Sequence, residues 1–411
     1  MQNKESKDRN VIKENLGEVT SKSKDNNLKE RAVEKKMVGK VTAKSAENNV
    51  NDLKVYYGDS NEVVPFGLND FNEFVNITES KQSMNGFEDR YRDVVDYIIK
   101  STHRIWEEKG IGLINKHYNN SAVVHTGSDN AVGKNAVISN TMQTLHSFPD
   151  RRLLGENVIW SGNDKDGFYS SHRIMSTATN LGDSTFGPAT GKKAIFRTVA
   201  VTFLHNNRVC EEWIVRDNLY IVQQLGLEPI EVAKNLAKMS KNKVPALQST
   251  FGISENKAGQ LSPQEYIPKH EGFEIGDFIL SMFNKIWQGN LINEVRNYYA
   301  DNAVVHFICN QDLEGYNQIQ AMFISLFASC TNADVIIERV TCNKRAKENE
   351  WDVAVRWRIK GIHEGIGYFG YPSGKHIEIL GVNHLRIANE KVIEEWITFD
   401  ALDVLKQIYT E

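Results

Sequence analysis

The most constraining feature of the sequence is an internal repeat that spans most of the chain. Ala-Val-Val-His occurs twice, ending at His125 and at His306, and Glu-Glu-Trp-Ile occurs twice, ending at Ile214 and at Ile397. The offset between the copies is 181 residues at the first motif and 183 residues at the second. Because this period is far longer than the roughly 20–50 residues of solenoid and propeller repeats, it predicts two copies of one domain.

Each copy begins with helical periodicity and continues with strand-like alternation. In the first copy, helical spacing covers 88–117 and 134–145, and strand-like segments cover 121–126, 152–161, 167–180 and 192–217. The last segment is expected to fold back as a hairpin at His205-Asn206-Asn207. Helices followed by several strands, without regular alternation of the two, indicate an α+β fold with antiparallel sheets.

Composition divides the chain into four parts. Residues 1–50 hold 12 Lys or Arg and 8 Asp or Glu with no apolar period, so they bury too little surface to offset the entropy of ordering. We therefore predict a disordered polar tail at 1–62, a first domain at 63–228, a linker at 229–270 and a second domain at 271–411.

Charge and motif content exclude several classes of protein. The chain has 49 Lys or Arg and 53 Asp or Glu, a net charge of −4, which argues against nucleic acid or a membrane surface as partner. No run of about 18 apolar residues predicts a spanning helix, and the first residues lack an apolar signal core, so a cytoplasmic protein is expected. The four cysteines lack C-x-x-C spacing, and Walker, Rossmann, H-E-x-x-H and G-x-S-x-G motifs are absent. Neither a metal nor an organic cofactor is therefore predicted.

An ordered set of short motifs carries a family resemblance. The first copy has His125-Thr-Gly127, Phe148-Pro-Asp150 and Glu211-Glu-Trp213-x-x-x-Asp217, and the second has Gly361-Ile-His363-x-Gly365 and Glu394-Glu-Trp396-x-x-x-Asp400. With these motifs both copies resemble SnoaL-like domains, the polyketide-cyclase or ester-cyclase branch of the nuclear transport factor 2-like superfamily.

The resemblance implies a fold and a kind of chemistry. The fold is a cone, in which a strongly curved antiparallel sheet wraps around helices and leaves an apolar pocket at one end. Relatives of this type use the pocket without metal or organic cofactor, with an Asp as general acid/base in ring closure. That Asp is similar in position to Asp217 and Asp400. The fold also hosts binding modules and scaffolds, so it does not determine the function by itself.

The Glu-Glu-Trp-x-x-x-Asp motif supplies the first candidate site residues. Since side chains alternate along a strand, we expect Glu211, Trp213 and Asp217 to share one face. The second copy should present Trp396 and Asp400 in the same way. A carboxylate beside an indole on an apolar concave face has a raised pKa, which suits proton transfer near neutral pH. The alternative is that each Asp caps the helix that follows it, and both interpretations stay open.

The strand at 353–363 supplies further candidates in the second copy. Its alternation places Trp357 and His363 on the expected pocket face, opposite the arginines of the strand. His363 is then a candidate acid/base partner for Asp400.

The first copy differs from the second at the same face. His172 stands at one end of the matching strand, and Asn180 occupies the position of the second copy's histidine, so His172 is the remaining acid/base candidate there. His125 and His306 end the first strand of each copy and are expected to line the pocket mouth. For each single histidine, a buried structural role is the more common outcome.

Two classes of function remain. The favoured hypothesis is a cofactor-independent enzyme, a cyclase, isomerase or lyase that acts on a small apolar carbonyl compound. The alternative is a non-catalytic small-molecule-binding or scaffold protein of the same fold. In either case the two domains are expected to pack as an intramolecular pseudo-dimer, and a homo-oligomer of the whole chain is compatible with the sequence.

Overall fold

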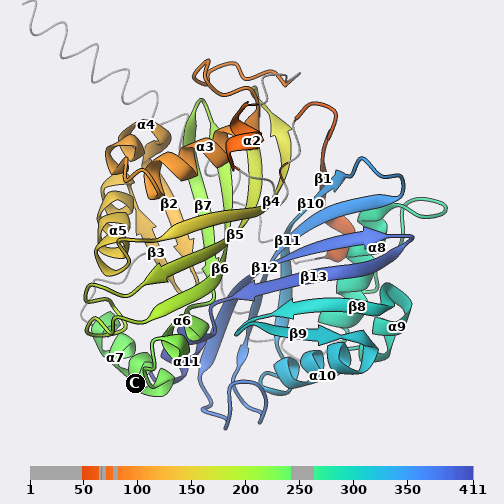
Figure 1. The fold of residues 1–411 in the computed structure, drawn as a ribbon. Helices are drawn as coiled ribbons and strands as arrows, with labels where there is room; N and C mark the ends of the chain where they lie inside the picture. The colour runs from red at the N-terminus through yellow and green to blue at the C-terminus, as the bar shows by residue number, and fades with distance from the viewer. Residues whose placement is uncertain (1–48, 64–65, 67–70, 77–81, 242–262, 411) are drawn as a thin grey trace, which may run out of the picture. The chain divides into compact units, whose positions relative to one another are not determined.

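A computed structural model describes residues 49–410 except 64–65, 67–70, 77–81 and 242–262 (Figure 1). Two sheets, each mostly antiparallel, are accompanied by helices that come before and after the long strands of each sheet. The α+β class expected from the sequence is therefore confirmed. We call residues 94–224 the first lobe and residues 275–408 the second lobe.

The first lobe is built on a six-stranded sheet with the order β3-β2-β7-β6-β5-β4. All neighbouring strands are antiparallel except β2 and β7, which are parallel. Before it in the chain lies the short helix α2 (Phe71–Asn76). The elements of the lobe are α3 (Val94–Trp106), η2 (Ile111–Leu113), α4 (Ile114–His117), β2 (Tyr118–Thr126), β3 (Asp129–Val132), α5 (Lys134–Ser147), β4 (Arg152–Asn163), β5 (Gly167–Thr179), β6 (Lys193–His205), β7 (Arg208–Arg216) and α6 (Asn218–Gln224).

The second lobe repeats this order of elements on a seven-stranded sheet, β1-β10-β11-β12-β13-β8-β9. Here β8 and β13 are the parallel pair, and β1 (Val55–Gly58) adds in parallel to β10. The elements are α8 (Ile275–Met282), η3 (Phe283–Gln288), η4 (Ile292–Glu294), α9 (Val295–Tyr298), β8 (Tyr299–Phe307), β9 (Gln311–Glu314), α10 (Gly315–Ala328), β10 (Asp334–Lys344), β11 (Glu350–Ile362), β12 (His376–Ala388), β13 (Lys391–Phe399) and α11 (Ala401–Ile408).

Local sequence explains where several elements begin and turn. Asp93 precedes α3, and its carboxylate accepts the backbone N–H of Asp96 at 2.7 Å, which satisfies one of the free donors of the first helical turn. The predicted hairpin at residues 205–207 joins β6 to β7. Asn206 and Asn207 adopt φ angles of 49° and 63°, as a tight turn between twisted strands requires. Asparagine tolerates this left-handed conformation better than most residues.

The N-terminal prediction needs a correction. Residues 49–62, which were expected to belong to a disordered tail, include a 3₁₀ helix η1 (Val50–Asp52) and strand β1. The run Val55-Tyr-Tyr has high strand propensity, and the free edge of β10 supplies its hydrogen-bond partners. The guanidinium of Arg339 lies 3.7 Å from the ring centre of Tyr56 and holds the added strand further. Residues 1–48 lie outside the described part of the chain.

The predicted linker at 229–270 is partly structural. Residues 229–241 form helix α7 (Pro229–Lys241). Val232 and Ala233 of this helix are buried in the same hydrophobic cluster as the interior of the second lobe. The helix therefore packs as part of the folded body, because its apolar side chains find a core. Residues 242–262 lie outside the described part.

The two sheets share a buried contact surface. Val199, Val201 and Trp213 of the first lobe form one hydrophobic cluster with Leu380 and Val382 of the second. At the same surface, two cation–π contacts occur in a reciprocal arrangement. Arg173 lies 3.5 Å from the ring centre of Trp396, and Arg356 lies 3.5 Å from that of Trp213. Both faces of the central strands are consequently buried.

Candidate functional site

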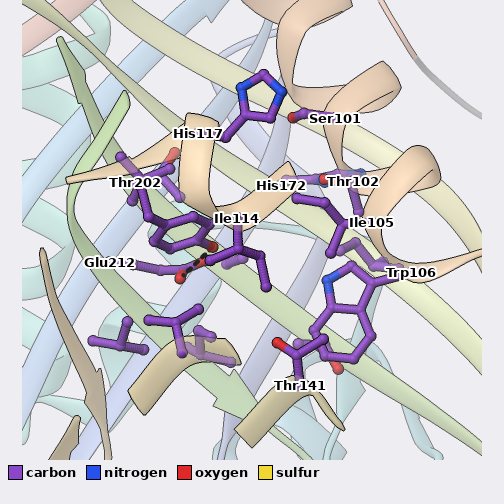
Figure 2. Close-up of a pocket in the computed structure, with 18 of the residues that line it drawn as sticks. Ser101, Thr102, Ile105, Trp106, Ile114, His117, Thr141, His172, Thr202 and Glu212 are labelled. Carbon is purple, nitrogen blue, oxygen red and sulfur yellow. Dashed lines mark hydrogen bonds between the residues drawn. The ribbon is translucent and has the colours of Figure 1, made fainter. Parts of the chain in front are cut away.

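A cavity of about 190 Å³ lies in the first lobe, between the helices and the concave face of the sheet (Figure 2). Much of its wall is aliphatic or aromatic. Helices α3, α4 and α5 and strands β2, β5, β6 and β7 all contribute to the wall. The apolar lining includes Ile98, Ile105, Trp106, Ile114, Val124, Val137, Ile174 and Ile214, and the polar lining includes Ser101, Thr102, His117, Tyr118, Asn140, Thr141, Thr144, Arg151, His172, Thr198, Thr202, Glu212 and Arg216.

Strand register arranges the polar groups along the cavity. On β7, Glu212, Ile214 and Arg216 point into it at every second residue. Thr202 is paired with Glu212 and Thr198 with Arg216, so two hydroxyls accompany the charged groups on the neighbouring strand. Glu212 and Arg216 are four residues apart, which is about 13 Å along a strand. The cavity therefore has a carboxylate at one end and a cationic group at the other.

Glu212 is the candidate acid/base group of the cavity. Its side chain is buried, and its Oε2 atom accepts a hydrogen bond from the Tyr118 hydroxyl at 2.9 Å. Burial raises the pKa of Glu212 to about 7, against the opposing effect of the Tyr118 hydrogen bond. Near neutral pH both the protonated and the ionised forms are populated. This is the property that a group needs to take up and return a proton during catalysis.

His172 also lines the cavity, between the two charged ends of the β7 row. Desolvation lowers its pKa to about 3, although Glu156 acts in the opposite direction, so the imidazole is neutral at physiological pH. Its buried Nε2 atom has no hydrogen-bond partner among the described residues, and neither has the Thr198 hydroxyl. Buried polar atoms without partners are uncommon in folded proteins, so these two are unusual features of residues that line the cavity.

In the second lobe, side chains fill the corresponding interior. Trp357 lies across it, with its ring centre 5.0 Å from that of Trp287 and 6.2 Å from that of Phe399. Gly381 is paired with Trp357 across β11 and β12, and any Cβ at residue 381 would collide with the indole. The offset of 183 residues matches Phe399 to Arg216 of the first lobe. Larger and less polar residues thus close this interior.

The closed interior of the second lobe also contains a buried carboxylate. Glu395, which corresponds to Glu212, accepts hydrogen bonds from the Tyr299 hydroxyl at 2.6 Å and from the Asn383 side-chain amide at 2.7 Å. Burial raises its pKa to about 7 despite both hydrogen bonds. Glu395 therefore has the proton affinity of Glu212 without a comparable space beside it.

The prediction that Asp217 and Asp400 face a pocket shared with the tryptophans is wrong. Asp217 caps α6 by accepting the Tyr220 N–H at 3.2 Å, and it also accepts the Cys309 N–H of the second lobe at 2.5 Å. Asp400 caps α11 and accepts a hydrogen bond from the Asn218 side chain. Burial raises the pKa of Asp217 to about 6 and that of Asp400 to about 7. The helix-cap alternative describes both residues.

Trp213 and Trp396 also lie on the other face of their strands. Each stacks on the histidine that ends the neighbouring strand, so His125 lies 5.2 Å from Trp213, and His306 lies 5.1 Å from Trp396, between ring centres. These four residues belong to the surface between the sheets rather than to the wall of the cavity. Side chains do alternate along β7, but the predicted face is not the face of the cavity. Both faces of β7 are buried, so exposed polar residues do not tell them apart.

The remaining predicted site residues lie outside the cavity and make hydrogen bonds within the fold. Trp357 donates from its indole N–H to Asn383 Oδ1 at 2.7 Å inside the closed interior. His363 lies just beyond β11, where its Nδ1 atom is 3.1 Å from the Ser373 hydroxyl. Asn180 donates to the Gly182 carbonyl at 2.8 Å and organises the loop between β5 and β6. Of the predicted site residues, His172 is the one that lines the cavity.

Sequence reasoning missed Glu212, Tyr118 and Arg216. A comparison of the residues at matching strand positions in the two copies could have indicated them. Arg216 of the first copy is replaced by Phe399 in the second, and Thr198 is replaced by Gly381, whereas Glu212 is matched by Glu395. Such differences mark a space that is polar in one copy and filled in the other.

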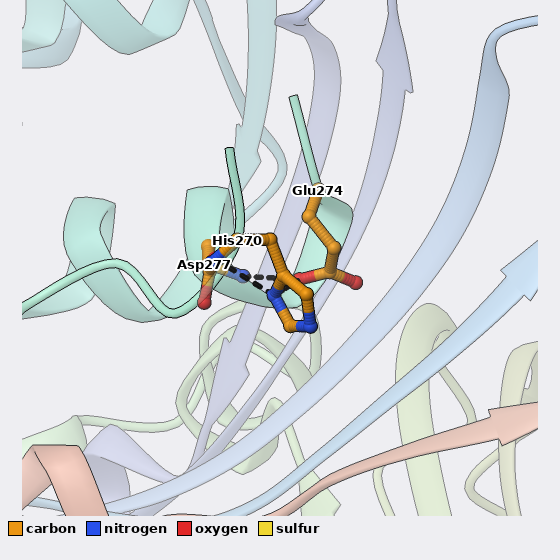
Figure 3. Close-up of side chains that lie close together, drawn as sticks. All are labelled: His270, Glu274 and Asp277. Atoms are coloured by element: carbon orange, nitrogen blue, oxygen red, sulfur yellow. Dashed lines mark hydrogen bonds and ion pairs between the residues drawn. The ribbon is translucent and has the colours of Figure 1, made fainter. Parts of the chain in front are cut away.

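A possible metal-ligand group occurs elsewhere, at the start of α8 (Figure 3). His270, Glu274 and Asp277 lie close together there, but their atoms are committed to local hydrogen bonds. Asp277 Oδ2 accepts the N–H groups of Lys269 and His270 at 2.9 Å each, and Oδ1 accepts the Tyr266 hydroxyl at 2.5 Å. Glu274 caps the helix by accepting the Asp277 N–H at 2.7 Å. This arrangement is that of a helix start and gives no support to a metal site.

In comparison with known proteins, part of the chain is similar to one protein family. The model of the SnoaL-like polyketide cyclase family matches residues 278–408, which is the second lobe. No curated protein matches the sequence. Within the described residues, no helix is long and apolar enough to cross a membrane.

Several solved structures are similar to about a third of the chain. A protein named as a SnoaL-like polyketide cyclase from Jannaschia sp. CCS1 is 25% identical, with 33% of this chain and 91% of that chain covered and a TM-score of 0.29. One named as a polyketide cyclase from Acidithiobacillus ferrooxidans is 21% identical, with 32% and 92% covered and a TM-score of 0.28. A protein with a ketosteroid isomerase-like fold from Catenulispora acidiphila is 18% identical, with 31% and 90% covered and a TM-score of 0.25.

Proposed function

We propose that the protein is a cofactor-independent acid/base enzyme that acts on a small, largely apolar carbonyl compound in the cavity of the first lobe. The observation that carries the proposal is Glu212, a buried carboxylate with a pKa of about 7 on the wall of an otherwise largely apolar cavity. The match of the second lobe to SnoaL-like polyketide cyclases supports the same class of chemistry.

The proposed reaction starts with enolisation. Ionised Glu212 removes a proton from the carbon next to the substrate carbonyl. The electron pair of the broken C–H bond forms a C=C bond, and the π pair of the C=O bond moves to the carbonyl oxygen. Neutral His172, which lines the same cavity, donates a hydrogen bond from its ring N–H to that oxygen. Protonated Glu212 then returns the proton, either to carbon in an isomerisation or to the oxygen formed when the enolate attacks a second carbonyl in a ring closure.

The two lobes have unequal roles in this proposal. The second lobe has the carboxylate Glu395 but no open space beside it, since Trp357 and Phe399 occupy the interior. We propose that it acts as the packing partner of the first lobe within an intramolecular pseudo-dimer. The cation–π contacts of Arg173 and Arg356 support this arrangement.

The test measures proton abstraction without knowledge of the natural substrate. Butyrophenone, a small apolar ketone, is incubated with the protein in deuterium oxide, and exchange next to the carbonyl is followed by mass spectrometry. The wild-type protein should exceed the buffer rate, and Glu212→Gln should lose at least about 100-fold of the protein-dependent rate. The rate should rise with pH until Glu212 is ionised, at about pH 7.

Glu395→Gln is the matched control, because it removes a buried glutamate of the same pKa from an interior that is closed. Equal loss in both variants, or none in Glu212→Gln, would contradict the proposal. Stabilisation of the protein by the ketone without exchange would support the alternative, a small-molecule-binding protein.

A further inference from the structure

The cavity contains a second chemical feature that the proposed acid/base step does not use. Arg151 and Arg216 both contribute to its wall, and both guanidinium groups face the ring of Phe196, at 5.3 Å and 5.8 Å from its centre. Burial lowers the pKa of Arg151, and the nearby Arg216 lowers it further. Two cations thus share one end of a largely apolar cavity.

Arg151 is held in place, but only part of its hydrogen-bonding capacity is used. It is 4% exposed, its guanidinium lies 4.8 Å from the ring centre of Trp106, and its Nε and Nη2 atoms donate to the Ser176 hydroxyl at 3.3 Å and 3.0 Å. Its buried Nη1 atom has no hydrogen-bond partner among the described residues. A fixed guanidinium with a free N–H edge is prepared to bind an acceptor.

Arg216 has fewer hydrogen-bond partners than Arg151. Within the described residues its guanidinium makes neither a hydrogen bond nor an ion pair, and its buried Nε atom is without a partner. Burial lowers the pKa of Arg216, and the nearby charge of Asp400 acts in the opposite direction. However, Asp400 caps α11 and bonds to Asn218, and its own pKa is raised to about 7, so it offers at most a partial negative charge near neutral pH.

The two guanidinium groups at this end of the cavity therefore lack a full negative counter-charge among the described residues. Arginine stays protonated in proteins, and a buried charge is costly unless it is paired. Glu212 is about 13 Å away along β7 and is hydrogen-bonded to Tyr118, so it does not serve as the counter-ion. The planar donor fork of arginine matches a carboxylate in geometry and charge.

We propose that Arg151 and Arg216 form a binding site for the carboxylate of a substrate whose apolar body extends along the cavity towards Glu212. This inference rests on the proposed function, because it assigns the substrate class of the same cavity: a keto acid with its carboxylate distant from the reacting carbonyl. The Thr198 hydroxyl, which is beside Arg216 on the neighbouring strand and has no partner, donates to the same carboxylate.

Binding of synthetic probes tests the inference. The probes are phenyl ketones with a terminal carboxylate on alkyl chains of increasing length, each paired with its primary amide, and affinity is measured by isothermal titration calorimetry. At the best chain length, the carboxylate should bind the wild-type protein at least about tenfold more tightly than the amide. Arg216→Met and Arg151→Met should each reduce this preference, and Arg216→Lys should retain part of it.

Thermal unfolding without ligand separates a binding role from a structural one. Removing a half-buried charge that has no ion-pair partner among the described residues should leave the melting temperature of Arg216→Met equal to or above that of the wild-type protein. A lower melting temperature together with an unchanged carboxylate preference would assign Arg216 a structural role and overturn the inference. Equal affinity of acid and amide for the wild-type protein would overturn it without any variant.

Glu212→Gln distinguishes this inference from the proposed function. It should abolish deuterium exchange of the bound keto acid while leaving the preference for carboxylate over amide intact. If the preference is found but no exchange occurs in the wild-type protein, the anion site stands and the acid/base function fails. If exchange occurs without a preference, the anion site alone is wrong.

Discussion

Replacing Glu395 by Gln should make the protein more stable at alkaline pH. The carboxyl group is fully enclosed by the second lobe and receives hydrogen bonds from Tyr299 and Asn383. Its pKa is about 7, raised mainly by desolvation, against 4.5 for the ordinary side chain. Glutamine keeps the shape of the protonated acid but cannot ionise, so it removes the cost of a buried negative charge.

The sign and size follow from proton linkage. Because the folded pKa lies above the unfolded one, the folded state holds the proton more strongly, and stability falls as pH rises from about 4.5 to about 7. The full effect of a shift of this size is about 3 kcal/mol, of which about 2–3 kcal/mol is lost between pH 5 and pH 8. Above pH 8 the contribution is constant.

Urea denaturation at pH 5 and at pH 8 measures the effect. The quantity of interest is the difference in unfolding free energy between Glu395→Gln and the wild-type protein at each pH. That difference should move in favour of the variant by about 2–3 kcal/mol from pH 5 to pH 8. Other titrating groups cancel in the comparison. A difference that is the same at both pH values would refute the claim that Glu395 is a desolvated carboxyl of raised pKa.

Three further predictions concern other parts of the molecule. Trp357→Ala should open the interior of the second lobe and cost about 3–5 kcal/mol in urea unfolding, and admitted water should lower the pKa of Glu395; an unchanged stability would mean that the indole does not fill this interior. Asp217→Asn should leave deuterium exchange of butyrophenone within about twofold of wild type, whereas Asp217→Ala should lose about 1 kcal/mol of stability with its helix cap. A large loss of exchange in Asp217→Asn would return this residue to the catalytic site. Partial burial and the nearby Asp217 raise the pKa of Cys309 to about 12, so iodoacetamide at pH 8 should label this thiol at least about 100-fold more slowly in the folded protein than in urea; equal rates would contradict a half-buried, protonated thiol.

Much of the fold was predictable from periodicity and turn chemistry. The order of helices and strands, the α+β class and the hairpin at Asn206-Asn207 all follow from local sequence, because apolar spacing and turn residues act over a few positions. The ordered strand at 55–58 was missed for a different reason. Its stability comes from the edge of β10, which is about 280 residues distant in the sequence.

The site was less predictable because its location depends on tertiary packing. On β7, Glu211 and Trp213 face the other sheet while Glu212 faces the cavity, and all three are buried. Burial on both sides removes the polar-outside signal that normally tells the two faces of a strand apart. Whether an interior is open or closed depends on pairs such as Gly381 and Trp357, which meet across strands.

The presence of both sheets on a single polypeptide allows them to differ. In a symmetric dimer of identical chains, every substitution occurs twice, and a phenylalanine at the position of Arg216 would abolish both cavities together. Here Phe399 affects one lobe alone and leaves the other hollow. The second half of the molecule can consequently gain stability from aromatic packing, while the first keeps an open space with charged side chains in its wall.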